Sequence, residues 1–183
     1  MNREEANIVL AEADLLVPKS EVEAAITRMA LEITDQLNGS DPILLCIMNG
    51  GLIFTGQLLT KLVFPLELDY IHATRYGHDI NGANLHWSVK TQLDLKGRTV
   101  LLLDDILDEG FTLAAIADHC RRQGAADVFM AVLIEKLHLR KVTPGMRADF
   151  TGIEVGDRFL FGYGLDYKGY WRNAPGIYAV KGL

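Results

Sequence analysis

The sequence predicts an α/β protein with a central parallel sheet flanked by helices. Apolar runs at 43–48, 99–104 and 128–134 are rich in leucine, isoleucine and valine, and they are too short for buried helices. Such runs are typical of strands that are buried on both faces of a parallel sheet. Helical patterns at 52–62 and 113–123 separate the three runs. Strands that alternate with helices in this way form right-handed βαβ units.

A further helix is expected before the first of these strands. Ser20 and Glu23 have the spacing of a capping box, which makes Ser20 the expected N-cap. Apolar residues then recur at helical spacing as far as Leu37, and the pair Asn38-Gly39 ends the pattern. The helix therefore has one apolar face.

Shorter elements fill the rest of the chain. The sequence Asn49-Gly50-Gly51 predicts a tight turn, and residues 66–73 alternate like a strand. Residues 76–84 are rich in glycine, asparagine, aspartate and histidine, so we expect a mobile loop there, and then a short returning strand at 85–91. From residue 149 onward, short β-like pieces follow one another between glycines and prolines, and no strong helix is expected.

Composition and charge exclude several classes of protein. The formal net charge of −6 argues against non-specific binding of nucleic acid. No apolar run approaches the length of a membrane span, and the N-terminus lacks the apolar core of a signal peptide. Cys46 and Cys120 lie in apolar patterns, so we expect buried free thiols in a cytoplasmic protein. The five histidines show no metal-ligand spacing, and surface or core positions are expected for them.

The segment 99–113 carries the most chemical information. Its apolar strand leads to Asp104, Asp105 and Asp108, and a short glycine loop that ends at Thr112 then opens a helix. Ligands bind at the carboxyl ends of strands in open α/β sheets, and N–H groups at a helix N-terminus suit phosphate. An acidic loop after a core strand is the plain alternative. The Asp-Asp-x-x-Asp pattern of prenyl-diphosphate enzymes is excluded, because those enzymes carry it on long helices with a second acidic cluster that this sequence lacks.

The same segment resembles the phosphoribosyl-pyrophosphate motif of type I phosphoribosyltransferases. The resemblance implies the fold of that family in one domain, 1–183, with a parallel-sheet core at about 20–145 and a small hood at about 147–183 to which the N-terminal residues can contribute. It also implies that Asp104 and Asp105 hold the ribose hydroxyls and the shell of a metal ion, while Asp108 is the general base. The implied 5-phosphate loop consists of Asp108, Glu109, Gly110, Phe111 and Thr112.

Two further loops narrow the resemblance to the 6-oxopurine branch, the hypoxanthine-guanine phosphoribosyltransferases. Residues 45–51 resemble the loop that binds pyrophosphate through backbone N–H groups around a cis peptide, here with Asn49 and Gly50. Taken alone, a simple strand-to-helix turn would explain its glycines. This chain at Arg75 and Tyr76 resembles the start of the family's lid, a loop that excludes water from the reacting centre. An ordinary loop aromatic is the alternative for Tyr76.

Recognition of the base is implied by two segments nearer the C-terminus. Lys136 ends a strand at the position where the family has a lysine that donates to purine O6. Such a donor would face the amino group of adenine, which is also a donor, so adenine would be disfavoured. Without the resemblance, a solvated strand flank is the usual interpretation. The segment 157–172 resembles the purine-binding hood. The implied contacts there are stacking by Phe159, backbone contacts at Leu160 and Asp166, a metal-bound water near Asp166, and pyrophosphate at Arg172. A core position on an edge strand is the alternative for Phe159.

The chain departs from the family pattern at three positions. Glu109 stands where the family usually has Thr or Ser, Asn49 where it often has Lys, and Arg75 where it commonly has a hydroxyl residue. A carboxylate that faced phosphate would be repulsive, so we expect the Glu109 side chain to point outward while its N–H still serves the phosphate. Whether the Asn49 side chain contacts pyrophosphate stays open.

Together these resemblances imply a purine-salvage phosphoribosyltransferase that converts hypoxanthine or guanine and 5-phosphoribosyl 1-diphosphate to IMP or GMP and pyrophosphate. Mg²⁺ would be its cofactor, held by Asp104, Asp105 and Asp166 mostly through water or the ribose hydroxyls. A cytoplasmic homodimer or homotetramer is expected, without nucleic-acid or membrane partners. A preference for xanthine or for guanine alone is one alternative. A regulatory nucleic-acid-binding protein of this fold is another, although it would need a basic face or an added winged-helix domain.

Overall fold

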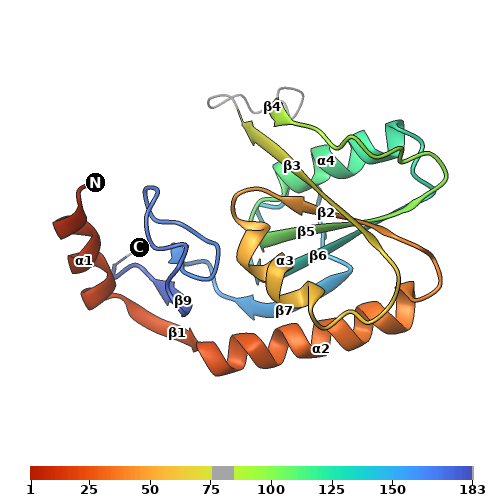
Figure 1. The fold of residues 1–183 in the computed structure, drawn as a ribbon. Helices are drawn as coiled ribbons and strands as arrows, with labels where there is room; N and C mark the ends of the chain where they lie inside the picture. Colours follow the sequence, from red (N-terminus) through yellow and green to blue (C-terminus); the bar gives the residue numbers. More distant parts are fainter. Residues whose placement is uncertain (76–84, 183) are drawn as a thin grey trace.

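The computed structural model describes residues 1–75 and 85–182 (Figure 1). Its helices are α1 (Arg3–Glu12), α2 (Lys19–Leu37), α3 (Gly51–Leu59) and α4 (Phe111–Arg122). Its strands are β1 (Asp14–Pro18), β2 (Ile43–Ile47), β3 (Glu67–Arg75), β4 (Leu85–Val89), β5 (Thr99–Leu107), β6 (Asp127–Lys136), β7 (Phe150–Val155), β8 (Leu160–Phe161) and β9 (Gly176–Ala179). None of the described helices combines the length and hydropathy that a bilayer crossing requires.

A six-stranded sheet forms the body of the protein and confirms the predicted α/β class. Its strand order is β4-β3-β2-β5-β6-β7. The pairs from β3 to β7 are all parallel, and only the edge strand β4 runs antiparallel to its neighbour β3. Strands β2 and β5 lie in the middle, so their carboxyl ends open at the centre of one sheet edge.

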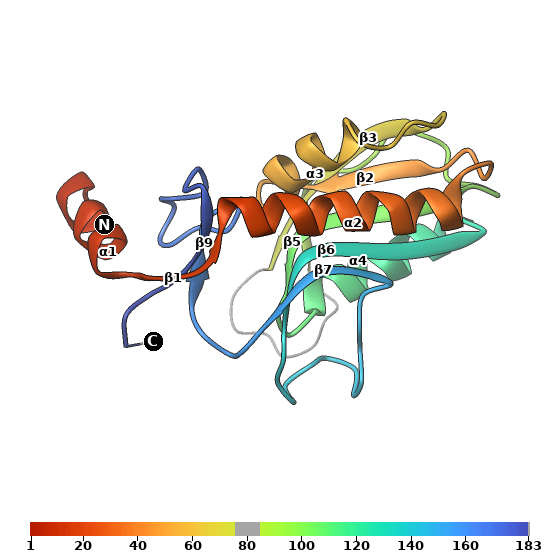
Figure 2. The same ribbon diagram turned by 90° about the horizontal axis from the view of Figure 1, so that it is seen from below.

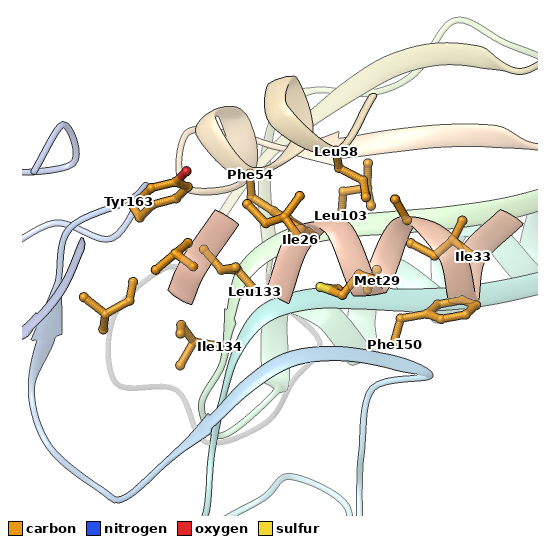
Figure 3. Close-up of a cluster of buried hydrophobic side chains, with 14 of the residues drawn as sticks. Ile26, Met29, Ile33, Phe54, Leu58, Leu103, Leu133, Ile134, Phe150 and Tyr163 are labelled. Carbon is orange, nitrogen blue, oxygen red and sulfur yellow. The ribbon is translucent and has the colours of Figure 1, made fainter. Parts of the chain in front are cut away.

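Helices cover both faces of this sheet, as Figure 2 shows. Helices α2 and α3 pack on one face, and α4 packs on the other. Alternate residues of each central strand supply the two cores: Leu101 and Leu103 face α2 and α3, whereas Val100 and Leu102 face α4. The larger core is drawn in Figure 3, where side chains of α2, α3 and the central strands interdigitate. Burial on both faces explains the continuous apolar runs of these strands.

A second, smaller sheet lies beside the main one and joins the two ends of the chain. Strand β1 pairs antiparallel with β9, which pairs with β8. The indole Nε1–H of Trp171 donates to the backbone oxygen of Ala6 at 2.6 Å, which ties α1 to the loop before β9. The segment 150–155, for which we expected a place in the hood, is β7 and forms the edge of the main sheet.

Two local expectations need correction, and one local feature was not expected. Helix α2 begins at Lys19 with Pro18 as N-cap, so the expected cap at Ser20 is wrong; Pro18 still pairs with β9, and the chain turns into the helix at the next residue. A true capping box occurs at Asn2 and Glu5, at the start of α1, which we did not expect. Strand β5 does not end at Asp104 as expected but continues to Leu107, because its pairing with β6 continues as far as that residue.

Candidate active site

A cavity of about 510 Å³ opens at the carboxyl ends of the central strands. Segments from β2, β3 and β5, the N-terminus of α4 and the loop before β9 line it. The structure thus brings together every residue expected to bind ribose, phosphate or pyrophosphate. These residues are Asn49, Gly50, Asp104, Asp105, Asp108, Glu109, Gly110, Phe111, Thr112 and Arg172.

The glycines after β2 are required by close packing at one wall of the cavity. A Cβ on Gly50 would lie 2.1 Å from the carboxylate Oδ2 of Asp105, and a Cβ on Gly51 would lie 2.6 Å from the backbone oxygen of Leu103. No side chain fits at either position. The peptide between Met48 and Asn49 is cis, as the resemblance implied. At Gly50 the backbone therefore reaches the cavity without a side chain that would block an anion.

Asp104 and Asp105 lie side by side near the end of β5, and the backbone N–H of Asp105 donates to Asp104 Oδ1 at 2.9 Å. Burial, together with the neighbouring charge of Asp105, holds the pKa of Asp104 well above its usual value. Burial also raises the pKa of Asp105, although Asp104 and the charge of Arg172 oppose that shift. Burial makes both carboxylates costly to ionise, so they favour ligands that donate hydrogen bonds or carry positive charge.

The next part of the cavity is the turn into α4. Gly110 is the N-cap of α4 and has a φ of 85°, a left-handed conformation that suits glycine. A Cβ there would also meet Met146 Sδ at 2.7 Å. The first N–H groups of a helix have no acceptor within the helix, and the helix dipole favours an anion at that end. This turn is accordingly a suitable phosphate site.

Asp108 lies at the mouth of this turn between two donors. Its Oδ2 accepts from Lys136 Nζ at 2.9 Å, and its Oδ1 is 2.7 Å from His138 Nε2. The Lys136 side chain is only 10% exposed and the His138 side chain 5%, whereas Asp108 is open to the cavity. Burial alone would raise the pKa of Asp108, but the hydrogen bonds from Lys136 and His138 outweigh it and lower that pKa. Asp108 is thus an ionised carboxylate with a fixed orientation.

Ion pairs continue outward from Lys136. Its Nζ is 3.7 Å from Asp157 Oδ1, and Arg140 binds the same carboxylate through two nitrogens at 2.6 and 3.1 Å. Arg140 Nε also lies 4.0 Å from Glu109 Oε1. These contacts join the phosphate loop to the chain after β6.

An acidic cluster that could hold a cation by its spacing is also present here. Oxygen or nitrogen atoms of Asp108, His138 and Asp157 lie within 4.8 Å of one another. However, the ammonium of Lys136 contacts both carboxylates of this cluster. A positive charge already occupies this position, so Asp104 and Asp105 are the better candidates for a metal.

The hood residues lie beside this cavity. The Phe159 side chain is 46% exposed and meets the ring of Tyr167 edge-on at 5.3 Å, which excludes the core position that was its alternative. Leu160 is buried in β8. Asp166 pairs with Arg172 at 2.5 Å, and Arg172 also donates to the backbone oxygen of Gly164 at 2.6 Å.

The expected lid is described only at its start. Arg75 is the last residue of β3. Tyr76 and the rest of the expected loop at 76–84 lie outside the described residues.

Several residues of this site were missed by sequence reasoning. His138, Asp157 and Arg140 surround Asp108 and Lys136, and His72 and Thr74 line the cavity from β3. His138 follows the end of β6 by two positions, and the only available signal was this proximity to Lys136. Its partner Asp108 is 30 residues away, so no local spacing connects the two.

Comparisons with known proteins give matches over most of the chain. The chain matches the family model of the phosphoribosyl transferase domain over residues 14–168. It is 32% identical to the hypoxanthine-guanine phosphoribosyltransferase of Aquifex aeolicus, over 91% of this chain and 94% of the relative. A solved hypoxanthine-guanine-xanthine phosphoribosyltransferase superposes with a TM-score of 0.83 at 27% identity, over 92% of this chain and 96% of the other. A Staphylococcus aureus hypoxanthine phosphoribosyltransferase shares the fold, with a TM-score of 0.88 at 23% identity, over 99% of this chain and 96% of the other.

Proposed function

Because the chain belongs to the phosphoribosyltransferase family, we propose that it is a purine-salvage enzyme that converts hypoxanthine or guanine, with 5-phosphoribosyl 1-diphosphate, to IMP or GMP and pyrophosphate. The observation that carries this proposal is the meeting of Lys136 with Asp108 at the edge of the cavity, 2.9 Å apart. A fixed ammonium donor beside a carboxylate acceptor matches the O6 and N7–H of a 6-oxopurine.

The reaction forms a bond between purine N9 and C1 of the phosphoribosyl substrate. The bond from C1 to pyrophosphate breaks, and its electron pair leaves with the pyrophosphate oxygen. The proton on N7 passes to Asp108, which is ionised beforehand. Lys136 carries three N–H donors, so it can keep its bond to Asp108 and donate another to O6. Such a reaction needs correct positioning and neutralisation of the leaving group more than a protein nucleophile.

The phosphoribosyl substrate fits the other parts of the cavity. The turn from Asp108 to Thr112 would bind the 5-phosphate at the N-terminus of α4, and Asp104 with Asp105 would accept hydrogen bonds from the ribose hydroxyls. The loop at Asn49 and Gly50 would bind pyrophosphate through its backbone, with Arg172 on the opposite side as counter-charge.

Mg²⁺ fits the carboxylate pair on chemical grounds. The oxygens of Asp104 and Asp105 are the ligand type that Mg²⁺ prefers, and a cation would relieve two carboxylates that burial makes costly to ionise. Asp166 is paired with Arg172, so its contact with the metal would run through water. When bound, the ion would neutralise charge on the departing pyrophosphate.

The base would lie under the hood. Phe159 is exposed and can stack on a purine, while the backbone at Leu160 and Asp166 would face the exocyclic edge of the base. Arg75 and Tyr76 would close over the reacting centre as part of a lid. These roles follow the resemblance residue by residue, and each can be tested by substitution.

The decisive experiment is a pyrophosphate-release assay with 5-phosphoribosyl 1-diphosphate, Mg²⁺ and one base at a time. Hypoxanthine and guanine should be substrates, and adenine and uracil should not. Xanthine tests the alternative preference, since a structural neighbour is named for all three 6-oxopurines. Omission of Mg²⁺ in the presence of a chelator should abolish turnover. The absence of pyrophosphate release with every base would contradict the proposal.

We also infer that the enzyme is a homo-oligomer. An apolar groove of about 480 Å³ lies between α3 and β3, and Leu52, Leu68 and Tyr70 are exposed along it. A second copy of the chain would cover this surface. Light scattering should give a dimer or tetramer, and Leu52→Glu should shift it towards the monomer. Leu31→Glu, at an exposed leucine of α2, is the matched control and should leave the assembly unchanged.

We place the enzyme in the cytoplasm. Cys46 and Cys120 are both free and buried, which suits a reducing compartment. Burial raises the pKa of Cys120 to about 11, so this thiol is unreactive at neutral pH.

A further inference from the structure

His138 is the nearest neighbour of Asp108 that the proposed reaction does not use. Its Nε2 lies 2.7 Å from Asp108 Oδ1, while Lys136 occupies the other oxygen, Oδ2, at 2.9 Å. The imidazole is 5% exposed, so solvent does not compete for this hydrogen bond. The two carboxylate oxygens of the proposed base thus have different partners.

The tautomer of His138 follows from its second hydrogen bond. The backbone N–H of Arg140 donates to His138 Nδ1 at 3.1 Å. A backbone N–H can only donate, so Nδ1 must be the acceptor and the ring proton must lie on Nε2. The Nε2–H is then the donor to Asp108.

The segment that carries His138 is fastened to the segment that carries Asp108. The backbone N–H of Val142 donates to the Glu109 oxygen at 2.7 Å, and Lys141 Nζ donates to the Leu107 oxygen at 2.9 Å. These bonds lie on either side of Asp108 along the chain. One backbone contact and one side-chain contact therefore hold the two segments together, and they fix the distance from the imidazole to the carboxylate.

We propose that His138 is a positioning residue that holds Oδ1 of Asp108, so that a lone pair of Oδ2 faces the base while Lys136 keeps one N–H on Oδ2 and donates another to purine O6. The inference rests on the proposed function, in which Asp108 accepts the N7 proton. Without the His138 donor, the carboxylate could rotate and bind Lys136 through both oxygens. The lone pair that must meet N7–H would then be occupied.

The donor also acts on the charge of Asp108. A hydrogen bond to the ionised form lowers the pKa of a carboxyl, so loss of the donor should raise it. The other charged groups around Asp108 would stay in place in a His138 variant. They are Lys136, Arg140, Lys141, Glu109 and Asp157.

Two substitutions separate the donor from the bulk of the ring. His138→Leu removes the donor, whereas His138→Gln can place an amide N–H near the position of Nε2. We expect kcat to fall at least tenfold in His138→Leu, and the acid limb of kcat/KM to move up by about one pH unit. His138→Gln should recover kcat to within about threefold of the wild type. His119→Leu is the control, because His119 lies on α4 and packs against Trp87, and it should leave the profile unchanged.

A spectroscopic measurement on the wild type tests the tautomer without any assay of activity. In protein labelled with ¹⁵N-histidine at pH 8, the nitrogen shifts of His138 should show a proton on Nε2 and none on Nδ1. Assignment by comparison with His138→Gln identifies the signals.

The outcomes distinguish this inference from the proposed function. An active wild type with a His138→Leu profile like its own, a proton on Nδ1, or a folded His138→Gln as impaired as His138→Leu would each overturn the positioning role. A wild type that is inactive with every base would instead overturn the proposed function, and the tautomer measurement would still test the contact with Asp108.

Discussion

The carboxylates near the end of β5 and the carboxylate just beyond it differ in how they are held. Asp104 and Asp105 lie against each other, and burial raises the pKa of both. Asp108, at the opening of the next turn, receives donors from Lys136 and His138 that lower its pKa despite its partial burial. Asp104 and Asp105 can receive a cation or hydroxyl groups, whereas Asp108 is already an ionised acceptor before a substrate binds. One strand end thus supplies both a binding site and a base, because different neighbours face its successive residues.

The largest effect is expected when the ionised acceptor is removed. Asp108→Asn deletes the group that takes the N7 proton, so kcat should fall by roughly 10²–10⁴-fold. Pyrophosphate release at saturating substrates measures this loss, with circular dichroism as the check on folding. Asp118→Asn is the matched control, since Asp118 is exposed on α4 and pairs with Arg122 one turn further along the helix. Turnover close to that of the wild type would remove Asp108 from the mechanism.

The donor beside Asp108 should matter next. Lys136→Met keeps the apolar stem but removes the ammonium, and hydrogen bonds to charged groups are worth about 1.5–3 kcal/mol. Affinity for hypoxanthine and guanine should therefore fall by roughly 10–150-fold. Calorimetric titration measures both substrates, with Lys96→Met at an exposed turn as control. If only the phosphoribosyl substrate were weakened, the assignment of Lys136 to O6 would be wrong.

The comparison also predicts opposite effects on stability. The pKa of Asp104 is raised in the folded state, so the unfolded protein loses this proton first as pH rises above about 4. The free energy of unfolding of the wild type therefore falls over that range. Asp104→Asn removes this loss and should raise the free energy of unfolding at pH 7.5 by about 1 kcal/mol. Asp108 has a lowered pKa, so its contribution is present at pH 7.5 and is lost as pH falls through its folded value.

The stability measurement is denaturant unfolding of both variants at pH 7.5 and pH 4. Asp108→Asn should be less stable than the wild type at pH 7.5 by about 1–2 kcal/mol, because it leaves a nearly buried Lys136 without its closest carboxylate. The difference should largely persist at pH 4, which is still above the lowered folded-state pKa of Asp108, and it should be lost only below that pKa. Destabilisation of Asp104→Asn at pH 7.5 would contradict the contrast drawn between the two sites.

The smallest effect is expected at Glu109. Its carboxylate lies 4.0 Å from Arg140 Nε, so part of its charge is compensated. A remaining repulsion with phosphate would be about 1 kcal/mol per charge pair at 4 Å in water. Glu109→Thr should keep activity within about tenfold and modestly lower KM for the phosphoribosyl substrate. A large loss of activity would show that the contact with Arg140 has a role of its own.

The sequence was most informative where buried strands and their ends are concerned. Apolar runs such as 99–104 predicted the central strands. Parallel pairing brings the ends of β2, β5 and β6 to one edge of the sheet, so site residues far apart in the chain could be assigned to one cavity. Sheet burial leaves a strong pattern in the sequence, so the α/β class needed no structure.

The N-terminal elements and His138 show what such patterns leave out. Helix α1 buries only Ala6 and is held by Trp171 from the other end of the chain, so it has little apolar periodicity. Its capping box at Asn2 and Glu5 was the one usable signal. The role of His138 depends on a partner in the turn after β5, and a single histidine after a strand carries no sign of that contact.

The close approach of the hood loop to the core has a consequence for redesign. A Cβ on Gly164 would lie 2.2 Å from the Gly50 oxygen, and Gly50 itself has no room beside Asp105. These three residues therefore form a joint in which none can be enlarged alone, and substitutions there should combine non-additively. An engineer who wishes to change the accepted base by moving the hood would also move the anion loop. The two halves of the pocket are not separate modules, and variants should be selected with both substrates present.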